Sequence, residues 1–120
     1  MLNLDTHILV AALADELTAR ERVLVRNERL AVSDIVLWEL AKLVQLGRLV
    51  LDMDSVAFRR SLRHLIIIPI TIKIARKSTE LDFASDPADE LIAATSVVER
   101  IPLVTRDRKI LKSRMVPLAK

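Results

Sequence analysis

The sequence predicts a three-layer α/β/α sandwich, with helices on both faces of a central parallel sheet of four to five short strands. Short runs of Leu, Ile and Val alternate with helical segments along the 120 residues, and strands buried on both faces have this continuous aliphatic character. Hydrophobic residues make up 52% of the chain and charged residues 29%, which favours a compact fold over disorder. Because repeats, low-complexity segments and internal linkers are absent, we expect one domain over residues 1–120.

The predicted strands are brief and aliphatic. A final segment at 115–119 can add a strand at the edge of the sheet, where Pro117 is tolerated. The alternation of strands with helices fits right-handed crossovers between parallel strands. The four other strands are predicted at residues 1–5, 30–33, 66–70 and 102–105.

Helices are predicted between and after these strands. Gly47 is a C-terminal stop signal, Asp54 or Ser55 is an N-cap, and Asp86 followed by Pro87 combines an N-cap with a proline at the first helical position. The predicted helices cover residues 7–13, 15–27, 35–47, 54–65, 71–81, 86–101 and 106–113, and Trp38 is expected in the core.

Composition restricts the function classes. The chain has no cysteine, so it can form neither disulfides nor a cysteine-based metal site, and a cytoplasmic location is expected. No run approaches the roughly 18 uncharged apolar residues of a membrane span, so no membrane association is expected. The formal charge of +3, from 19 Lys and Arg against 16 Asp and Glu, is by itself weak evidence for a nucleic-acid partner.

A carboxylate stands at the end of the first predicted strand. Burying Asp5 is costly unless a partner compensates its charge, and no Lys or Arg lies nearby in the sequence. Ser33 and Asp34 end the second strand, and Thr105 and Asp107 follow the fourth. Because ligands of open α/β sheets bind beyond the carboxyl ends of the strands, we expect these polar groups to converge on one rim.

Two further acids lie on helices that lead away from this rim. Glu39 has mostly apolar neighbours one helical turn away, so it points along a largely apolar stripe. Asp89 lies in the first turn of its helix, on the same face as the small residues Ala93 and Ser96. Small residues let a helix pack closely on a sheet, so we expect Asp89 to be aimed at the rim.

Each of these acids also has a purely structural interpretation. Asp86 and Asp107 can cap helices, Asp89 can favour a helix dipole, and Glu39 can pair with Lys42. Four converging carboxylates, however, would repel one another and raise at least one pKa. A divalent cation removes this conflict, and Mg²⁺ and Mn²⁺ prefer oxygen ligands.

Four segments together resemble the PIN-domain family, and within it the VapC-type toxins of type II toxin–antitoxin modules. They are LDTH at 4–7, VSDIVLWELAKLVQLGRL at 32–49, DPADELIAATS at 86–96 and LVTRDRKI at 103–110. The resemblance covers nearly the whole chain. It implies an endoribonuclease that uses one or two Mg²⁺ or Mn²⁺ ions to hydrolyse RNA, together with a homodimeric state and a cognate antitoxin.

The resemblance also assigns residues. Asp86 matches the frequent DPxD pattern of the family and is a secondary candidate. The catalytic and metal-binding acids match Asp5, Glu39, Asp89 and Asp107. Hydroxyl positions that support the acids or metal-bound water match Thr6, Ser33 and Thr105. Several basic residues near these acids are expected to contact RNA phosphates: Lys42, Arg48, Arg106, Arg108, Lys109 and Lys112.

Two departures from the family pattern keep alternatives open. Related sequences often read H-x-D-P-x-D-R, whereas this chain has Ala84 and Glu90 in place of the His and the Arg. The extra acid beside Asp89 keeps open a catalytically impaired PIN fold that binds RNA or protein. A receiver-like phosphoacceptor domain is disfavoured, because Asp5 is single and the last strand is not followed by a clear match to the expected lysine.

Overall fold

The computed structural model describes residues 1–120 and contains a four-stranded parallel sheet. The strands lie in the order β3-β2-β1-β4, which places β1 between β2 and β4. The predicted strand at 115–119 is reduced to a single bridge between Leu118 and Leu103. The strand bounds are β1 Leu2–Leu4, β2 Leu30–Ser33, β3 Leu65–Ile68 and β4 Leu103–Val104.

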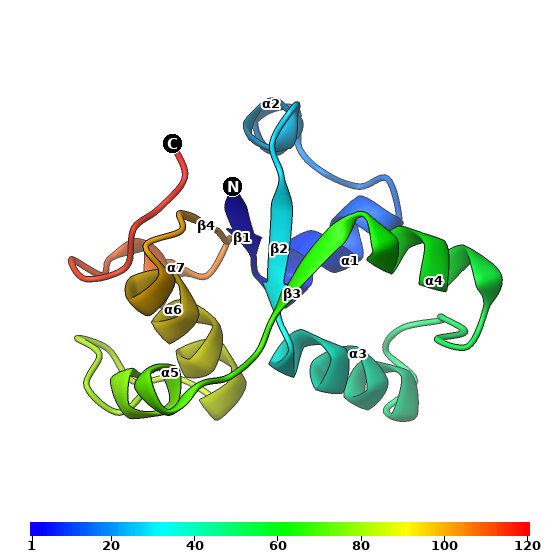
Figure 1. Cartoon of the computed structure of the whole chain (residues 1–120). Helices are drawn as coiled ribbons and strands as arrows, with labels where there is room; N and C mark the ends of the chain where they lie inside the picture. Colours follow the sequence, from blue (N-terminus) through cyan, green and yellow to red (C-terminus); the bar gives the residue numbers. More distant parts are fainter.

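Helices cover both faces of the sheet, which confirms the predicted α/β/α architecture. In Figure 1, α1 and α4 lie to one side of the sheet, and α5 and α6 lie to the other. None of the helices is both long enough and apolar enough to span a membrane. Their bounds are α1 Thr6–Leu13, α2 Ala19–Val25, α3 Ile35–Gln45, α4 Val56–Arg63, α5 Ile72–Lys77, α6 Pro87–Glu99 and α7 Arg108–Leu111.

Local capping makes most helices shorter than predicted. The largest difference is in α2, which begins at Ala19 because Thr18 and Glu21 form a reciprocal capping box. Of the two candidate caps of α4, Ser55 accepts the Phe58 amide. Gly47 has φ +71° and follows the end of α3, as expected for a residue that adopts the left-handed conformation without strain.

The two faces of the sheet have different side chains. On one face Leu4, Val32 and Phe58 belong to the main apolar cluster. On the other face Ala31 packs with Ala94 of α6, and these small side chains let α6 lie close to the strands. Close packing of α6 fixes the distance of its N-terminal turn, which carries Asp89, from the sheet.

The prediction that Trp38 is in the core is wrong. Its side chain is 53% exposed, whereas Val36 and Leu40 are fully buried. The buried residues occupy the face of α3 that meets the sheet, so Trp38 lies on another face of the helix. The Lys42 ammonium lies 5.7 Å from the centre of the Trp38 ring, within the range of a cation–π contact.

A buried amide attaches β1 to α6. Asn3 lies in the middle of β1, and its Nδ2 donates to the Ile92 carbonyl at 3.2 Å and to Ser96 Oγ at 3.0 Å. Its Oδ1 has no hydrogen-bond partner. Because Asp5 directly follows β1 and Asp89 lies in the first turn of α6, this attachment fixes the positions of the two acids relative to each other.

Candidate active site

Asp5 is buried at the point where β1 passes into α1. It is 2% exposed and caps α1, with its Oδ1 accepting the Thr6 amide at 2.8 Å. Its Oδ2 accepts the Thr105 hydroxyl at 2.6 Å. Both carboxylate oxygens are thus held by hydrogen bonds, and the position at the carboxyl end of the central strand is the one predicted.

Asp107 is tied to Asp5 through Thr105. The Asp107 amide donates to Thr105 Oγ1 at 3.0 Å, and the same hydroxyl donates to Asp5. Asp107 also caps α7 through Oδ1, which accepts the Lys109 amide at 2.8 Å. The capping interpretation of Asp107 is therefore confirmed, and it leaves Oδ2 of the same carboxylate without a hydrogen bond in the structure.

Glu39 extends from α3 toward α1. Its Oε1 accepts a short hydrogen bond from the Thr6 hydroxyl. Lys42 does not pair with Glu39, because its ammonium donates to Gln45 Oε1 at 3.1 Å. Burial raises the pKa of Glu39, and the nearby charges of Asp89 and Asp5 raise it further, against the lowering effect of the Thr6 bond.

Asp89 lies in the first turn of α6 and accepts the Ser85 hydroxyl at 3.1 Å. Burial raises the pKa of Asp89, and the charges of Asp5 and Asp107 act in the same direction. The charge of Asp86 adds a smaller effect. The charges of the two acids that follow β1 and β4 therefore both act on Asp89.

The four predicted acids act on one another electrostatically and form no ion pair with lysine or arginine. The charges of Asp5 and Asp89 raise the pKa of Glu39, and the charges of Asp5 and Asp107 raise the pKa of Asp89. The structure contains two ion pairs, Arg106 with Glu21 and the N-terminal ammonium with Glu28. Neither pair includes one of the four acids, so neighbouring arginine or lysine side chains do not neutralise the cluster.

The donor set suits a hard divalent ion, although it does not form a closed cage. Carboxylate and hydroxyl oxygens are the donors that Mg²⁺ and Mn²⁺ prefer, and sulfur is absent. No group of three or more His, Asp or Glu side chains is arranged so that it could hold a metal ion as it stands. An ion would therefore have to draw at least one carboxylate closer than the structure places it.

The secondary candidates have local roles. Ser33 is fully buried at the end of β2, and its Oγ accepts the Ile35 amide at 3.3 Å. Asp86 occupies the N-cap position of α6 without a capping hydrogen bond from its side chain. Ser33 thus supports the start of the helix that carries Glu39, whereas the exposed carboxylate of Asp86 acts on Asp89 through its charge.

Comparison with known protein families matches residues 3–114 to the PIN domain. The chain belongs to the PIN domain family. It is 32% identical to Ribonuclease VapC22 of Mycobacterium tuberculosis over 99 residues, which cover 80% of this chain and 76% of that protein. This similarity confirms the VapC-type resemblance within the PIN family.

Solved structures agree with the PIN assignment. The structure of VapBC2 from Rickettsia felis, bound to a DNA fragment from the promoter, has a TM-score of 0.70 at 25% identity and covers 98% of this chain and 97% of that chain. FitAcB from Neisseria gonorrhoeae has a TM-score of 0.71 at 19% identity, with 100% and 97% covered. The second similarity concerns the fold alone.

The two departures from the PIN pattern have different surroundings. Ala84 is exposed. Glu90 is partly buried, and its Oε2 lies 3.4 Å from the Ser85 amide, which donates to it. The acid that replaces the family's arginine therefore helps to hold the segment before α6, from which Ser85 reaches Asp89.

An open depression lies beside the acids of this PIN domain. It is lined by His7, Val10, Ala11, Glu16, Arg106 and Asp107. His7 is exposed, and its charge lowers the pKa of Glu39. The depression gives a ligand access to Asp107 from the surface.

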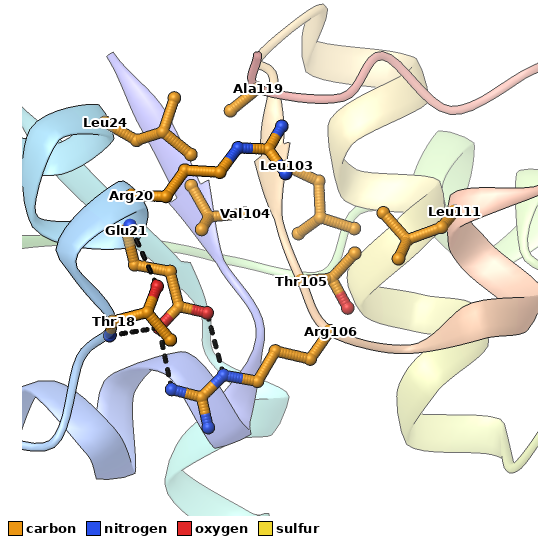
Figure 2. A pocket seen from close by; sticks show the side chains of 10 residues that line it. All are labelled: Thr18, Arg20, Glu21, Leu24, Leu103, Val104, Thr105, Arg106, Leu111 and Ala119. Carbon is orange, nitrogen blue, oxygen red and sulfur yellow. Dashed lines mark hydrogen bonds and ion pairs between the residues drawn. The ribbon is translucent and has the colours of Figure 1, made fainter.

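Sequence reasoning missed two features of the PIN site. Ser85 holds Asp89, and no motif singles out this serine. Arg106 was expected to contact phosphate, but its guanidinium pairs with Glu21 of α2, as Figure 2 shows. The capping-box spacing of Thr18 and Glu21 was a readable signal, although it gives no indication of the distant arginine.

Proposed function

We propose that this chain is a divalent-metal-dependent endoribonuclease of the VapC type that acts as the toxin of a toxin–antitoxin pair. The observation that carries this proposal is that Asp5, Glu39, Asp89 and Asp107 act on one another electrostatically while none of them forms an ion pair with lysine or arginine. The similarity to Ribonuclease VapC22 supports RNA as the substrate. The absence of cysteine fits the reducing cytoplasm.

In this proposal, Asp5 and Asp107 hold the ion, and Asp89 binds it directly or through water. When bound, one or two Mg²⁺ or Mn²⁺ ions polarise a phosphoryl oxygen and lower the pKa of water. The Thr105 hydroxyl donates to Asp5 and accepts the Asp107 amide, so it fixes the positions of these two residues relative to each other. Thr6 occupies one oxygen of Glu39.

Glu39 has the properties of a proton acceptor for the attacking water. Its Oε1 is held by Thr6, which leaves Oε2 free for a proton. Its raised pKa brings it closer to the operating pH than an ordinary glutamate, and this match favours general-base catalysis. Glu39→Gln is therefore expected to lower kcat more than it lowers the affinity for the metal.

Cleavage of a total RNA pool by purified protein tests the proposal. We expect cleavage with Mg²⁺ or Mn²⁺, none with EDTA, and none by Asp5→Asn in either condition. The matched control is Asp15→Asn, an exposed carboxylate at φ 55°, a conformation that asparagine tolerates well. Cleavage that persists in Asp5→Asn with added metal would overturn the proposal.

Metal binding has a second readout that does not need activity. Mn²⁺ is expected to raise the Tm of the wild type, because an ion that binds only the folded state stabilises it. Asp5→Asn should lose this shift, and Asp15→Asn should retain it. An equal Mn²⁺ shift in all three proteins would show that the four-acid cluster does not bind the ion.

An antitoxin and a second copy of the chain are proposed as partners. Leu13 is 39% exposed and Val50 is fully exposed, and both line a depression formed only by apolar residues. An exposed apolar depression of this kind is typical of a protein-binding surface. The similarity to the VapBC2 structure supports an antitoxin as a partner, and co-purification of the chain with a co-expressed candidate antitoxin tests the pairing.

A catalytically impaired PIN module is the second candidate. It is favoured by the absence of a ready metal cage and by the acid at position 90. The first experiment separates the two candidates, because an impaired module would bind RNA without cleaving it. The receiver-like alternative loses its basis, since β1 here lies between β2 and β4, whereas that fold places β1 between β2 and β3.

A further inference from the structure

Arg106 lies between two residues of the candidate site, and its guanidinium is paired with Glu21 of α2. Its Nε donates to Glu21 Oε2 at 2.7 Å, and its Nη2 donates to Glu21 Oε1 at 2.7 Å. Figure 2 shows this two-pronged contact across the gap between α2 and the segment after β4. Paired donors of this kind are among the strongest hydrogen bonds in proteins and fix orientation as well as distance.

The carboxylate of Glu21 is fully engaged. Besides the two bonds from Arg106, its Oε1 accepts the Thr18 amide at 2.9 Å, and the Glu21 amide donates to Thr18 Oγ1. Arg106 lowers the pKa of Glu21 to about 2. Glu21 is also the only buried residue of α2, while the partly buried Leu24 and Val25 of the same helix pack on the main core cluster, so the ion pair adds a polar contact to this apolar packing.

Arg106 belongs to the short segment Thr105–Asp107, which links β4 to α7. β4 has only two residues, Leu103 and Val104. The next residues carry the links to the acids: Thr105 donates to Asp5, and the Asp107 amide donates to Thr105. A lateral displacement of Arg106 would move both neighbours, because they are joined to it by rigid peptide units.

We propose that Arg106 and Glu21 are positioning residues that hold the Thr105–Asp107 segment in the geometry that Asp5 and Asp107 need for metal binding and RNA cleavage. This inference rests on the proposed function. It assigns to α2 the role of a support for the active site, and it removes Arg106 from the set of residues that contact RNA phosphates.

If Arg106 instead contacts an RNA phosphate, Glu21→Gln and Arg106→Gln should change the affinity for RNA in opposite directions. If Arg106 bound RNA, Glu21→Gln would free its charge and strengthen RNA binding, whereas Arg106→Gln would weaken it. If the pair positions the segment, both substitutions have the same effect. We expect a kcat lower by about tenfold or more, since small misplacements at an active site have effects of this size, with KM changed less than about twofold.

The experiment compares wild type, Glu21→Gln, Arg106→Gln and Arg106→Lys. Steady-state cleavage of one RNA substrate with Mn²⁺ gives kcat and KM. Hydrogen exchange of the Asp107 and Lys109 amides, in metal-free protein, reports the geometry of the segment independently of activity. Glu28→Gln is the matched control, because it breaks the other ion pair of the structure, with the N-terminal ammonium, and the Glu28 side chain forms no hydrogen bond with Arg106 or with the segment Thr105–Asp107.

The expected result is lower kcat and faster exchange of both amides in the two glutamine variants, with partial recovery in Arg106→Lys and none of these changes in Glu28→Gln. KM changes of opposite sign in Glu21→Gln and Arg106→Gln would overturn the inference, as would a lower Tm with unchanged kcat and exchange. If the wild type cleaves no RNA, the proposed function fails, and the exchange data still decide whether the pair holds the segment.

Discussion

Glu39 and Asp89 show how burial and mutual repulsion act on single residues. Both carboxyls have a raised pKa because they are partly buried and face other acids. In each case one hydroxyl, from Thr6 or Ser85, opposes the shift by donating to the carboxylate. The carboxylates therefore repel one another, and a bound divalent ion would reduce this repulsion.

Glu39→Gln is expected to raise the free energy of unfolding at pH 7.5 in metal-free buffer. Because the pKa of Glu39 in the folded protein lies above the ordinary value of 4.5, the folded protein binds the proton more tightly than the unfolded chain. Its stability therefore falls as the pH rises from 4.5 through the folded pKa. Glutamine avoids this loss and still accepts the Thr6 hydroxyl.

Urea denaturation with EDTA measures this effect, and the gain should shrink toward zero as the pH is lowered to about 4.5, the ordinary glutamate range. Glu80→Gln, at an exposed position of the chain, serves as the matched control. A variant less stable than the wild type at pH 7.5 would contradict the electrostatic interpretation.

At the scale of elements, two polar contacts attach helices to the rest of the fold. Asn3 of β1 holds α6 through Ile92 and Ser96. The pair of Arg106 and Glu21 holds α2 against the segment after β4. Both contacts join segments that are distant in the sequence, so each has a long-range effect on the position of the acids.

Glu21→Gln is expected to lower the free energy of unfolding at pH 7 by about 1 kcal/mol. The lowered pKa of about 2 corresponds to a larger value for a dry pair, but the Arg106 side chain is 44% exposed, and solvent screens the interaction. For a lowered carboxyl pKa, the contribution is complete above pH 4.5 and is lost as the pH falls toward 2.

Denaturation of wild type and Glu21→Gln at pH 7, 4 and 3 tests this prediction. The difference between the two proteins should be largest at pH 7 and smallest at pH 3. A difference that does not change with pH would indicate that shape, and not charge, determines the effect.

Asn3→Ala is expected to destabilise the fold by about 1–3 kcal/mol, because it leaves a buried hydrogen-bonding group of α6 without its partner. Thermal or urea unfolding measures the loss. A double-mutant cycle with Ser96→Ala should show coupling between the two sites. Simple additivity of the two losses would mean that the bond between Asn3 and Ser96 contributes little.

At the scale of the whole molecule, exposed cations lie beside the acids of the candidate site without pairing with them. The acids of the candidate site carry no ion pairs, while Arg108, Lys109 and Lys112 are exposed on the neighbouring α7. A chain with a formal charge of only +3 can thus present cations to RNA phosphates beside an acidic centre. Affinity for RNA should then depend on salt through release of counterions.

Lys109→Gln is expected to weaken RNA binding at low salt and to reduce the slope of log affinity against log salt by about 0.7, the value for one phosphate contact with a single strand. Measurements use the Asp5→Asn protein to avoid cleavage. Arg60→Gln, an exposed cation on α4, is the control with unchanged slope. An unchanged slope in Lys109→Gln would exclude Lys109 as a phosphate contact.

Much of the architecture was predictable because it depends on local patterns. Aliphatic runs predicted the strands, and the cap signals at Gly47 and Ser55 predicted helix ends that the structure has. The helices were predicted too long, most clearly α2, because a capping box moves its start to Ala19. Trp38 was misplaced because apolar character alone does not specify which face of a helix meets the sheet.

The sequence by itself determined which acids stand at the ends of strands, because strand ends follow from local composition. The catalytic roles of these acids stay predictions. Only the tertiary structure decided the partners: Thr105 donates to Asp5 across 100 residues, and Arg106 reaches Glu21 across 85. The physical reason is that a hydrogen bond depends on the direction of two side chains from different elements, and only the packing of those elements sets both directions at once.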